Sequence, residues 1–73
     1  MSHVVSAEID ANVLSVSVES GQRVDATDAV MMLDSMKMEF PVLAEVAGIV
    51  TEVVVAVGDA VHDGEPLVVI AEA

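Results

Sequence analysis

The chain repeats its own pattern with an offset of 37 residues, and this repeat restricts the possible folds more than any other feature. Apolar residues and a glycine stand at matching places in the two copies. The matching residues are Val13, Val16, Val18, Gly21 and Val24 in the first copy and Val50, Val53, Val55, Gly58 and Val61 in the second. Two copies are too few for a solenoid, so the repeat predicts a closed arrangement with pseudo-twofold symmetry.

Alternation of apolar and polar residues predicts that each half is built from strands. In residues 12–18, apolar side chains alternate with Ser15 and Ser17, which places the two serines on the outer face. The inward-facing residues predicted from this alternation are Leu14, Val16 and Val18 in the first copy and Val53 and Val55 in the second. No segment repeats apolar residues at spacings of three and four, so we expect little or no helix.

Glycine and proline mark the ends of these strands. Gly21 and Gly58 each follow a strand and suit a turn that needs positive φ. Pro66 begins a strand after the turn residues 63–65, and Pro41 argues for a strand at the edge of a sheet. The sequence therefore predicts an all-β fold, a flattened barrel-sandwich of two antiparallel sheets with an internal pseudo-two-fold repeat, in which residues 1–73 form one domain.

The charge balance excludes several classes of partner. Thirteen acidic residues face only Arg23 and Lys37, which gives a formal net charge of -11. Binding to nucleic acid requires cations that replace counterions on phosphates, and an anionic membrane surface would repel the chain, so we expect neither partner. The sequence also has no signal-like or membrane-spanning apolar run, so we expect a cytoplasmic protein.

The sequence gives no sign of a metal centre or of a catalytic site. There is no cysteine, and neither His3 nor His62 has a second ligand at a metal-binding spacing. No serine has a partner histidine and carboxylate that the spacing reveals. We therefore predict no metal ligand, no catalytic residue and no enzymatic activity of the chain alone.

Lys37 is the only lysine, and it stands between Met36 and Met38. In the register of the repeat, residues 31–33 form one strand and residues 39–42 form the return strand. Lys37 is therefore predicted at or beside the tip of a tight hairpin, and the chain termini at the opposite end of the domain. A side chain at such a tip projects into solvent and can enter the active site of another protein.

The segment Asp34-Ser35-Met36-Lys37-Met38-Glu39-Phe40-Pro41-Val42 resembles the biotinyl-lysine hairpin of biotin carboxyl carrier domains, members of the biotinyl-lipoyl attachment family. Ser35 and Asp34 stand where the family has alanine and commonly glutamate. The resemblance covers nearly the whole chain, including the glycine-turn segments at Gly21 and Gly58. It is closest to small, stand-alone biotinylated carriers that lack an inserted thumb loop.

The resemblance implies that biotin is attached as an amide to Lys37, with Met36 and Met38 helping partner enzymes to recognise the lysine. A biotin protein ligase would supply an activated acyl donor. The carrier would then shuttle carboxyl groups from a biotin carboxylase to a carboxyltransferase. A monomer is the simplest expectation for a mobile carrier.

Two other interpretations remain open at this stage. Lipoyl carrier domains share the fold and use a hairpin lysine, but they have aspartate before the lysine and commonly alanine after it, where this chain has Met36 and Met38. The second alternative is an unmodified β-sandwich interaction domain, in which replacement of Lys37 by alanine would leave partner binding intact.

Overall fold

The computed structural model describes residues 1–73 and consists of strands, turns and connecting segments. The eight strands are β1 (Ser2–Ser6), β2 (Ala11–Val16), β3 (Arg23–Val24), β4 (Ala29–Ser35), β5 (Met38–Leu43), β6 (Gly48–Val53), β7 (Ala60–Val61) and β8 (Pro66–Glu72). This arrangement confirms the predicted all-β class. None of its segments is a helix long and apolar enough to cross a membrane.

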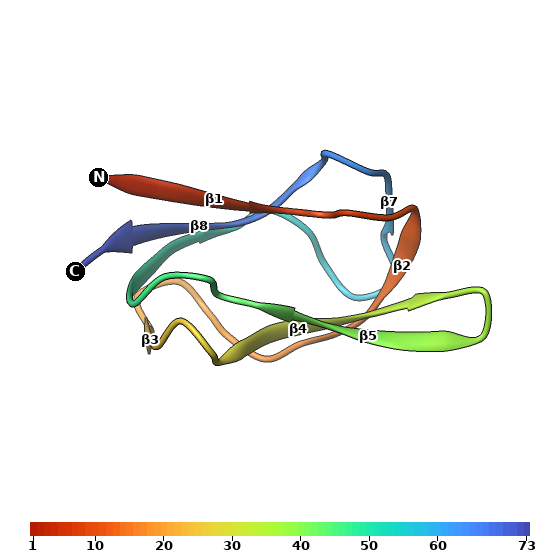
Figure 1. The fold of residues 1–73 in the computed structure, drawn as a ribbon, viewed down its shortest axis with the longest axis horizontal. Helices are drawn as coiled ribbons and strands as arrows, with labels where there is room; N and C mark the ends of the chain where they lie inside the picture. Colours follow the sequence, from red (N-terminus) through yellow and green to blue (C-terminus); the bar gives the residue numbers. More distant parts are fainter.

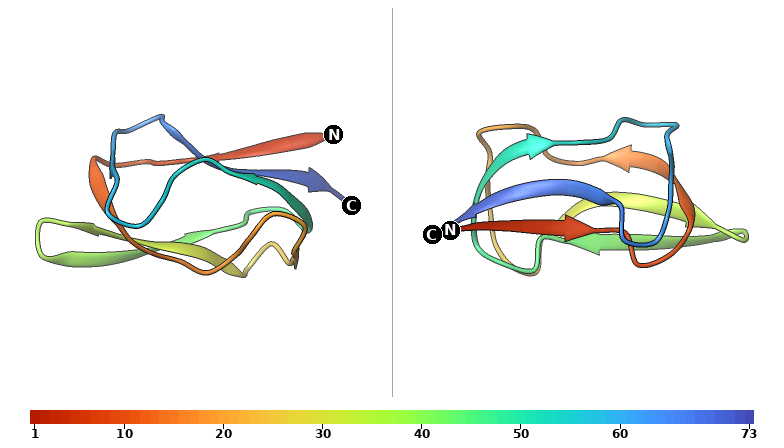
Figure 2. Two further views of the ribbon diagram at one scale, coloured as in Figure 1. Left: turned by 180° about the vertical axis from the view of Figure 1, so that it is seen from behind. Right: turned by 90° about the horizontal axis from the view of Figure 1, so that it is seen from above.

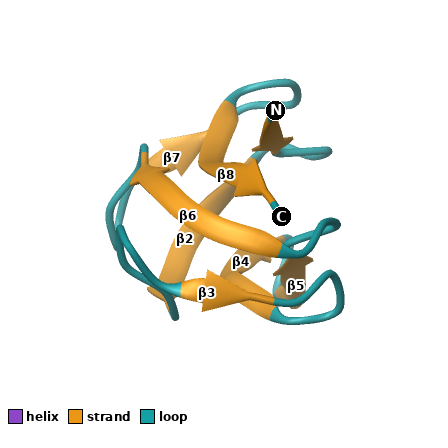
Figure 3. Ribbon diagram, turned by 90° about the vertical axis from the view of Figure 1, so that its left-hand side faces the viewer, coloured by secondary structure: helices purple, strands orange, loops and turns teal.

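The strands form two antiparallel sheets that face each other (Figures 1 and 3). One four-stranded sheet has the order β1-β8-β6-β3 and the other has the order β5-β4-β2-β7. Each sheet therefore contains two strands from the first copy of the repeat and two from the second. β5 belongs to the second copy, because it begins at Met38 and the offset is 37 residues. This interlocking explains why neither half can bury its apolar face alone. The position of β5 at a sheet edge agrees with the expectation from Pro41.

The hydrogen bonds repeat with the same offset as the sequence. Ala7 N donates to Glu65 O at 2.9 Å, and Ala44 N donates to Asp28 O at 2.8 Å. Gly21 and Gly58 have φ values of 95° and 94°, the left-handed conformation predicted for both glycine turns. The pseudo-twofold symmetry inferred from the sequence is thus present in the backbone.

A mainly valine core fills the space between the sheets. Its largest fully buried side chains are Met31, Leu67, Ile70, Val5, Val30, Val50, Val61 and Val68. No polar or charged residue is buried, so the core depends on apolar burial, at about 25 cal/mol per Å² removed from water. The thirteen carboxylates remain at the surface, where they are solvated.

The prediction that Leu14 faces inward is wrong. Leu14 is 42% exposed, whereas its neighbour Val13 is 2% exposed and belongs to the core. The pairing of β2 with β4 shifts between Val13 and Ser15, so Leu14 is the extra residue of a β-bulge. The bulge places Val13 and Val16 on the same inner side and breaks strict alternation. The second copy has the same shift between Val50 and Glu52.

The two ends of the molecule differ (Figures 1 and 2). The β4–β5 hairpin extends past the rest of the sandwich at one end, and both chain termini lie at the other. The molecule measures 35 × 18 × 17 Å along its principal axes. The predicted separation of the hairpin from the termini is confirmed.

Candidate functional site

The β4–β5 hairpin has a two-residue turn. Ser35 pairs with Met38 in the ladder, so only Met36 and Lys37 lie between the strands. Their φ values are 51° and 65°. Positive φ at both central residues is the requirement of a type I′ turn, whose twist matches that of the flanking strands. Lys37 is therefore at the apex of the hairpin, as the sequence predicted.

The residues of this turn are not those that its backbone favours. Type I′ turns prefer Asn-Gly, because a side chain in the left-handed region costs about 1–2 kcal/mol per residue. Here Met36 and Lys37 both adopt that conformation with full side chains. Backbone strain of this kind is frequent at active sites and binding sites, so the turn is a candidate functional site.

The Lys37 side chain is free. It is exposed, and it takes part in no hydrogen bond or ion pair with another residue. As the only lysine, its Nζ is the one side-chain amine that an acyl group could modify. An unhindered amine on a projecting turn fits a covalently attached acyl cofactor.

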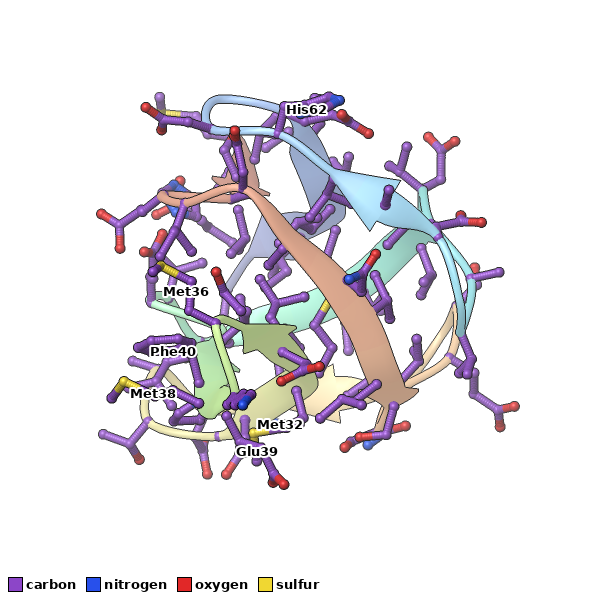
Figure 4. All side chains as sticks on the ribbon, turned by 90° about the vertical axis from the view of Figure 1, so that its right-hand side faces the viewer. Met32, Met36, Met38, Glu39, Phe40 and His62 are labelled. Atoms are coloured by element: carbon purple, nitrogen blue, oxygen red, sulfur yellow. The ribbon has the colours of Figure 1, made fainter.

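Two methionines flank this amine at the surface. Met36 is 90% exposed and Met38 is 59% exposed. Figure 4 looks onto this end of the molecule and shows Met38 directed outward, with Met32 and Glu39 on another side of the hairpin. Exposed thioethers are flexible and polarizable, which suits contact with more than one protein surface.

The base of the hairpin is held to the body of the domain. Ser35 Oγ donates a hydrogen bond to Asp10 O at 2.9 Å, and Asp10 Oδ1 accepts one from Asp63 N at 2.9 Å. Leu33, which pairs with Phe40, is buried in the core. The turn thus projects from a fixed support. An alanine at position 35 could not make this hydrogen bond. The sequence pattern alone did not reveal the bond.

Two hollows border the hairpin and differ in character. One, of about 440 Å³, has an apolar wall formed by Ile9, Leu33 and Phe40. The other, of about 290 Å³, adjoins Asp34 and Met36. The remaining lining of this second hollow is Asp10, Ala11, Asn12, Ser35, Ala60, Val61 and His62. The hairpin therefore borders a mainly apolar hollow through Leu33 and Phe40, and its turn borders a more polar one through Ser35 and Met36. Neither hollow was identified from the sequence.

An exposed amine on a strained turn, supported by a rigid sandwich, is the arrangement of a carrier domain. The chain matches the Biotin_lipoyl family, described as "Biotin-requiring enzyme", over residues 3–70. The chain belongs to this biotin/lipoyl carrier family, and its homologues are carrier proteins or domains of carboxylases that are not catalytic themselves. The resemblance to the biotinyl-lipoyl attachment family, inferred from the sequence, is confirmed.

Similar proteins include small carriers and parts of larger enzymes. The biotinylated protein TB7.3 homolog of Mycobacterium leprae (strain TN) is 50% identical over 70 residues, which cover 96% of this chain and 99% of that protein. The biotin/lipoyl attachment protein of Bacillus subtilis (strain 168) is 40% identical over 63 residues, 86% of each chain. The biotin-dependent acyl-coenzyme A carboxylase alpha3 subunit of Mycobacterium leprae (strain TN) is 41% identical over 63 residues, and the match spans 10% of that subunit.

Solved structures show the same fold. The Kluyveromyces lactis urea carboxylase matches with a TM-score of 0.91 and 27% identity over 97% of this chain and 6% of that enzyme. The lipoyl domain of the 2-oxoglutarate dehydrogenase complex from Azotobacter vinelandii matches with a TM-score of 0.75 and 27% identity over 100% of this chain and 95% of that domain. The fold is therefore common to proteins named for biotin and for lipoate, so the fold alone does not choose the cofactor.

Proposed function

We propose that this chain is a biotin carboxyl carrier in which Lys37 Nζ holds biotin through an amide bond. The observation that carries the proposal is the exposed, unpaired and unique lysine at the apex of a turn whose residues both have positive φ. In the same proposal, Met36 and Met38 form the apolar contact that partner enzymes recognise on either side of the lysine.

The residues of the chain act by presentation. Bound biotin supplies the ring nitrogen that accepts and releases a carboxyl group. The hairpin holds the attachment point away from the body of the domain, and the rigid ladder below it keeps the backbone of Lys37 in place. Tethering also replaces bimolecular delivery by a local search, with effective concentrations on the order of mM for a short flexible link. Formation of the amide removes the positive charge of Lys37.

The proposed partners are a biotin protein ligase, a biotin carboxylase and a carboxyltransferase. Support comes from the relatives that are named as biotin-dependent carboxylases or as biotinylated proteins. Met36 and Met38 also stand where lipoyl carriers have aspartate before the lysine and commonly alanine after it. A monomer is the simplest state for a mobile carrier, and we include this state and a cytoplasmic location in the proposal.

The test is incubation of the purified chain with biotin protein ligase, biotin and MgATP, followed by intact mass and peptide mapping. We expect one biotinyl group, on Lys37. A parallel reaction with lipoate ligase and lipoate should leave the chain unmodified. Modification by lipoate alone would favour the lipoyl interpretation. An unmodified chain in both reactions would favour an interaction domain.

A further inference from the structure

The five methionines fall into distinct environments. Met36 and Met38 are 90% and 59% exposed, whereas Met31 is 1% exposed in the core. Met32 is half-buried, and Met1 is exposed at the opposite end of the molecule. The chain has no cysteine, so thioethers are its only sulfur groups. The readily accessible sulfur atoms near the lysine are therefore the two that flank it.

Exposed thioethers react with peroxide. The sulfur attacks one oxygen of hydrogen peroxide, a sulfur–oxygen bond forms, the oxygen–oxygen bond breaks, and water leaves. The product is methionine sulfoxide, which methionine sulfoxide reductases return to methionine. Since access of peroxide to sulfur governs the rate, Met36 and Met38 should react well before Met31.

We propose that Met36 and Met38 are a reversible oxidation site that controls the acylation of Lys37. The inference rests on the proposed carrier function, because it assigns a regulatory role to the same turn. Oxidation converts the flexible apolar side chains beside the amine into polar, chiral ones.

The consequence for recognition follows from the position of the sulfur atoms. A ligase surface that accepts Lys37 between two thioethers must cover at least part of Met36 and Met38. An added sulfoxide oxygen brought against an apolar surface loses its hydrogen bonds to water and gains none in return. Oxidation should therefore weaken productive binding without unfolding the domain, because neither side chain belongs to the core.

The first measurement is the order of oxidation. The intact chain is treated with hydrogen peroxide for increasing times, quenched and mapped by peptide mass spectrometry. We expect Met36 and Met38 to gain oxygen first, together with Met1, and Met31 to react last. Oxidation of Met31 as fast as Met36 would overturn the assignment, since the two differ mainly in exposure.

The second measurement is the kcat/KM of biotin protein ligase for oxidised and untreated chain. We expect a fall of about tenfold or more, equivalent to about 1.4 kcal/mol. Treatment with methionine sulfoxide reductases A and B should restore the original value. Unchanged kcat/KM for chain whose Met36 and Met38 are both oxidised would overturn the proposal.

A double variant, Met36→Leu with Met38→Leu, provides the matched control. Its kcat/KM after peroxide is compared with its own untreated value, and the two should agree although Met1 is still oxidised. A peroxide-dependent loss as large as that of the wild type would place the effect elsewhere. If untreated wild type were not biotinylated at all, the carrier proposal itself would fall, and the control of acylation with it.

Discussion

The hairpin end and the terminal end of the molecule are related by the repeat, yet only one of them has a turn. Ala73 and Met1 occupy the places that correspond to Met36 and Met38. The terminal ladder still closes, because Glu72 N donates to Met1 O at 2.8 Å. Strand pairing at this place therefore does not depend on a connecting turn. The identity of the turn residues Met36 and Lys37 is thus not set by the pairing.

The side chains below the two ends also differ. Asp34 and Glu39 are opposite each other in the β4–β5 ladder, where like charges are unfavourable, whereas Ala71 and Ser2 form the equivalent pair of β8 and β1. The fold therefore does not require carboxylates at this place.

A third difference concerns Phe40 and His3, which occupy equivalent places in the two copies of the repeat. Phe40 forms part of the wall of the apolar hollow near the hairpin. The equivalent residue at the other end is His3, whose Nε2 lies 2.8 Å from Glu45 Oε1. The internal repeat thus separates features that the scaffold needs from features that belong to one end only.

The largest expected effect comes from moving the amine between the two ends. The variant Lys37→Arg should lose all ligase-dependent biotinylation, and adding Ala73→Lys to it should not restore any. The reason is that an exposed lysine at the terminal end lacks the turn and its flanking methionines. Intact mass after reaction with ligase measures both results. Biotin on the introduced lysine of the double variant would show that exposure alone is sufficient.

The next effect concerns a backbone contact that the halves do not share. A Cβ added to Gly48 would clash with the carbonyl oxygen of Ala71, whereas the equivalent residue of the first half is Ala11. We expect Gly48→Ala to lower the free energy of unfolding by about 3 kcal/mol. The matched change, Ala11→Gly, should cost only about 1 kcal/mol. Urea denaturation compares the two, and equal losses would contradict the close approach at Gly48.

A smaller effect of opposite sign is expected at the turn. Replacing Met36 by Asn and Lys37 by Gly supplies the residues that a type I′ turn favours. Unfolding free energy should rise by about 1 kcal/mol, which corresponds to a Tm increase of roughly 4–8 °C for a domain of this size. Thermal unfolding followed by circular dichroism tests this. A lower Tm would show that the methionine or lysine side chain stabilises the hairpin.

The smallest effect concerns the pair of carboxylates. Asp34→Asn removes like-charge repulsion with Glu39 and should stabilise the domain by about 0.2–1 kcal/mol at low salt. Added salt should reduce the gain, because exposed charges are screened. Glu52→Gln, an exposed carboxylate without such an opposing partner in the ladder, is the control. Equal shifts in Tm for both variants would indicate a general effect of net charge.

Most of the architecture could be predicted from the repeat. Alternation, the two glycine turns and Pro41 indicated the strands and their edge, and the offset indicated the symmetry. Leu14 shows where the pattern failed, because a bulge changes which residues face inward without leaving a sequence signal at that position. Leu14 and Thr51 are equivalent in the repeat, and one is apolar whereas the other is polar. This difference could have suggested that the position faces outward in both copies.

The sequence by itself determined the candidate residue and its neighbours, since a unique lysine between two methionines can be read without coordinates. Only the tertiary structure decided that Met36 and Lys37 both adopt positive φ, that Ser35 anchors the hairpin to Asp10, and that a mainly apolar and a more polar hollow border the hairpin. The physical reason is the sequence separation over which each feature is determined. Residue type and local spacing are properties of the chain, whereas turn twist, bulges and hollows depend on how two sheets from different halves pack together.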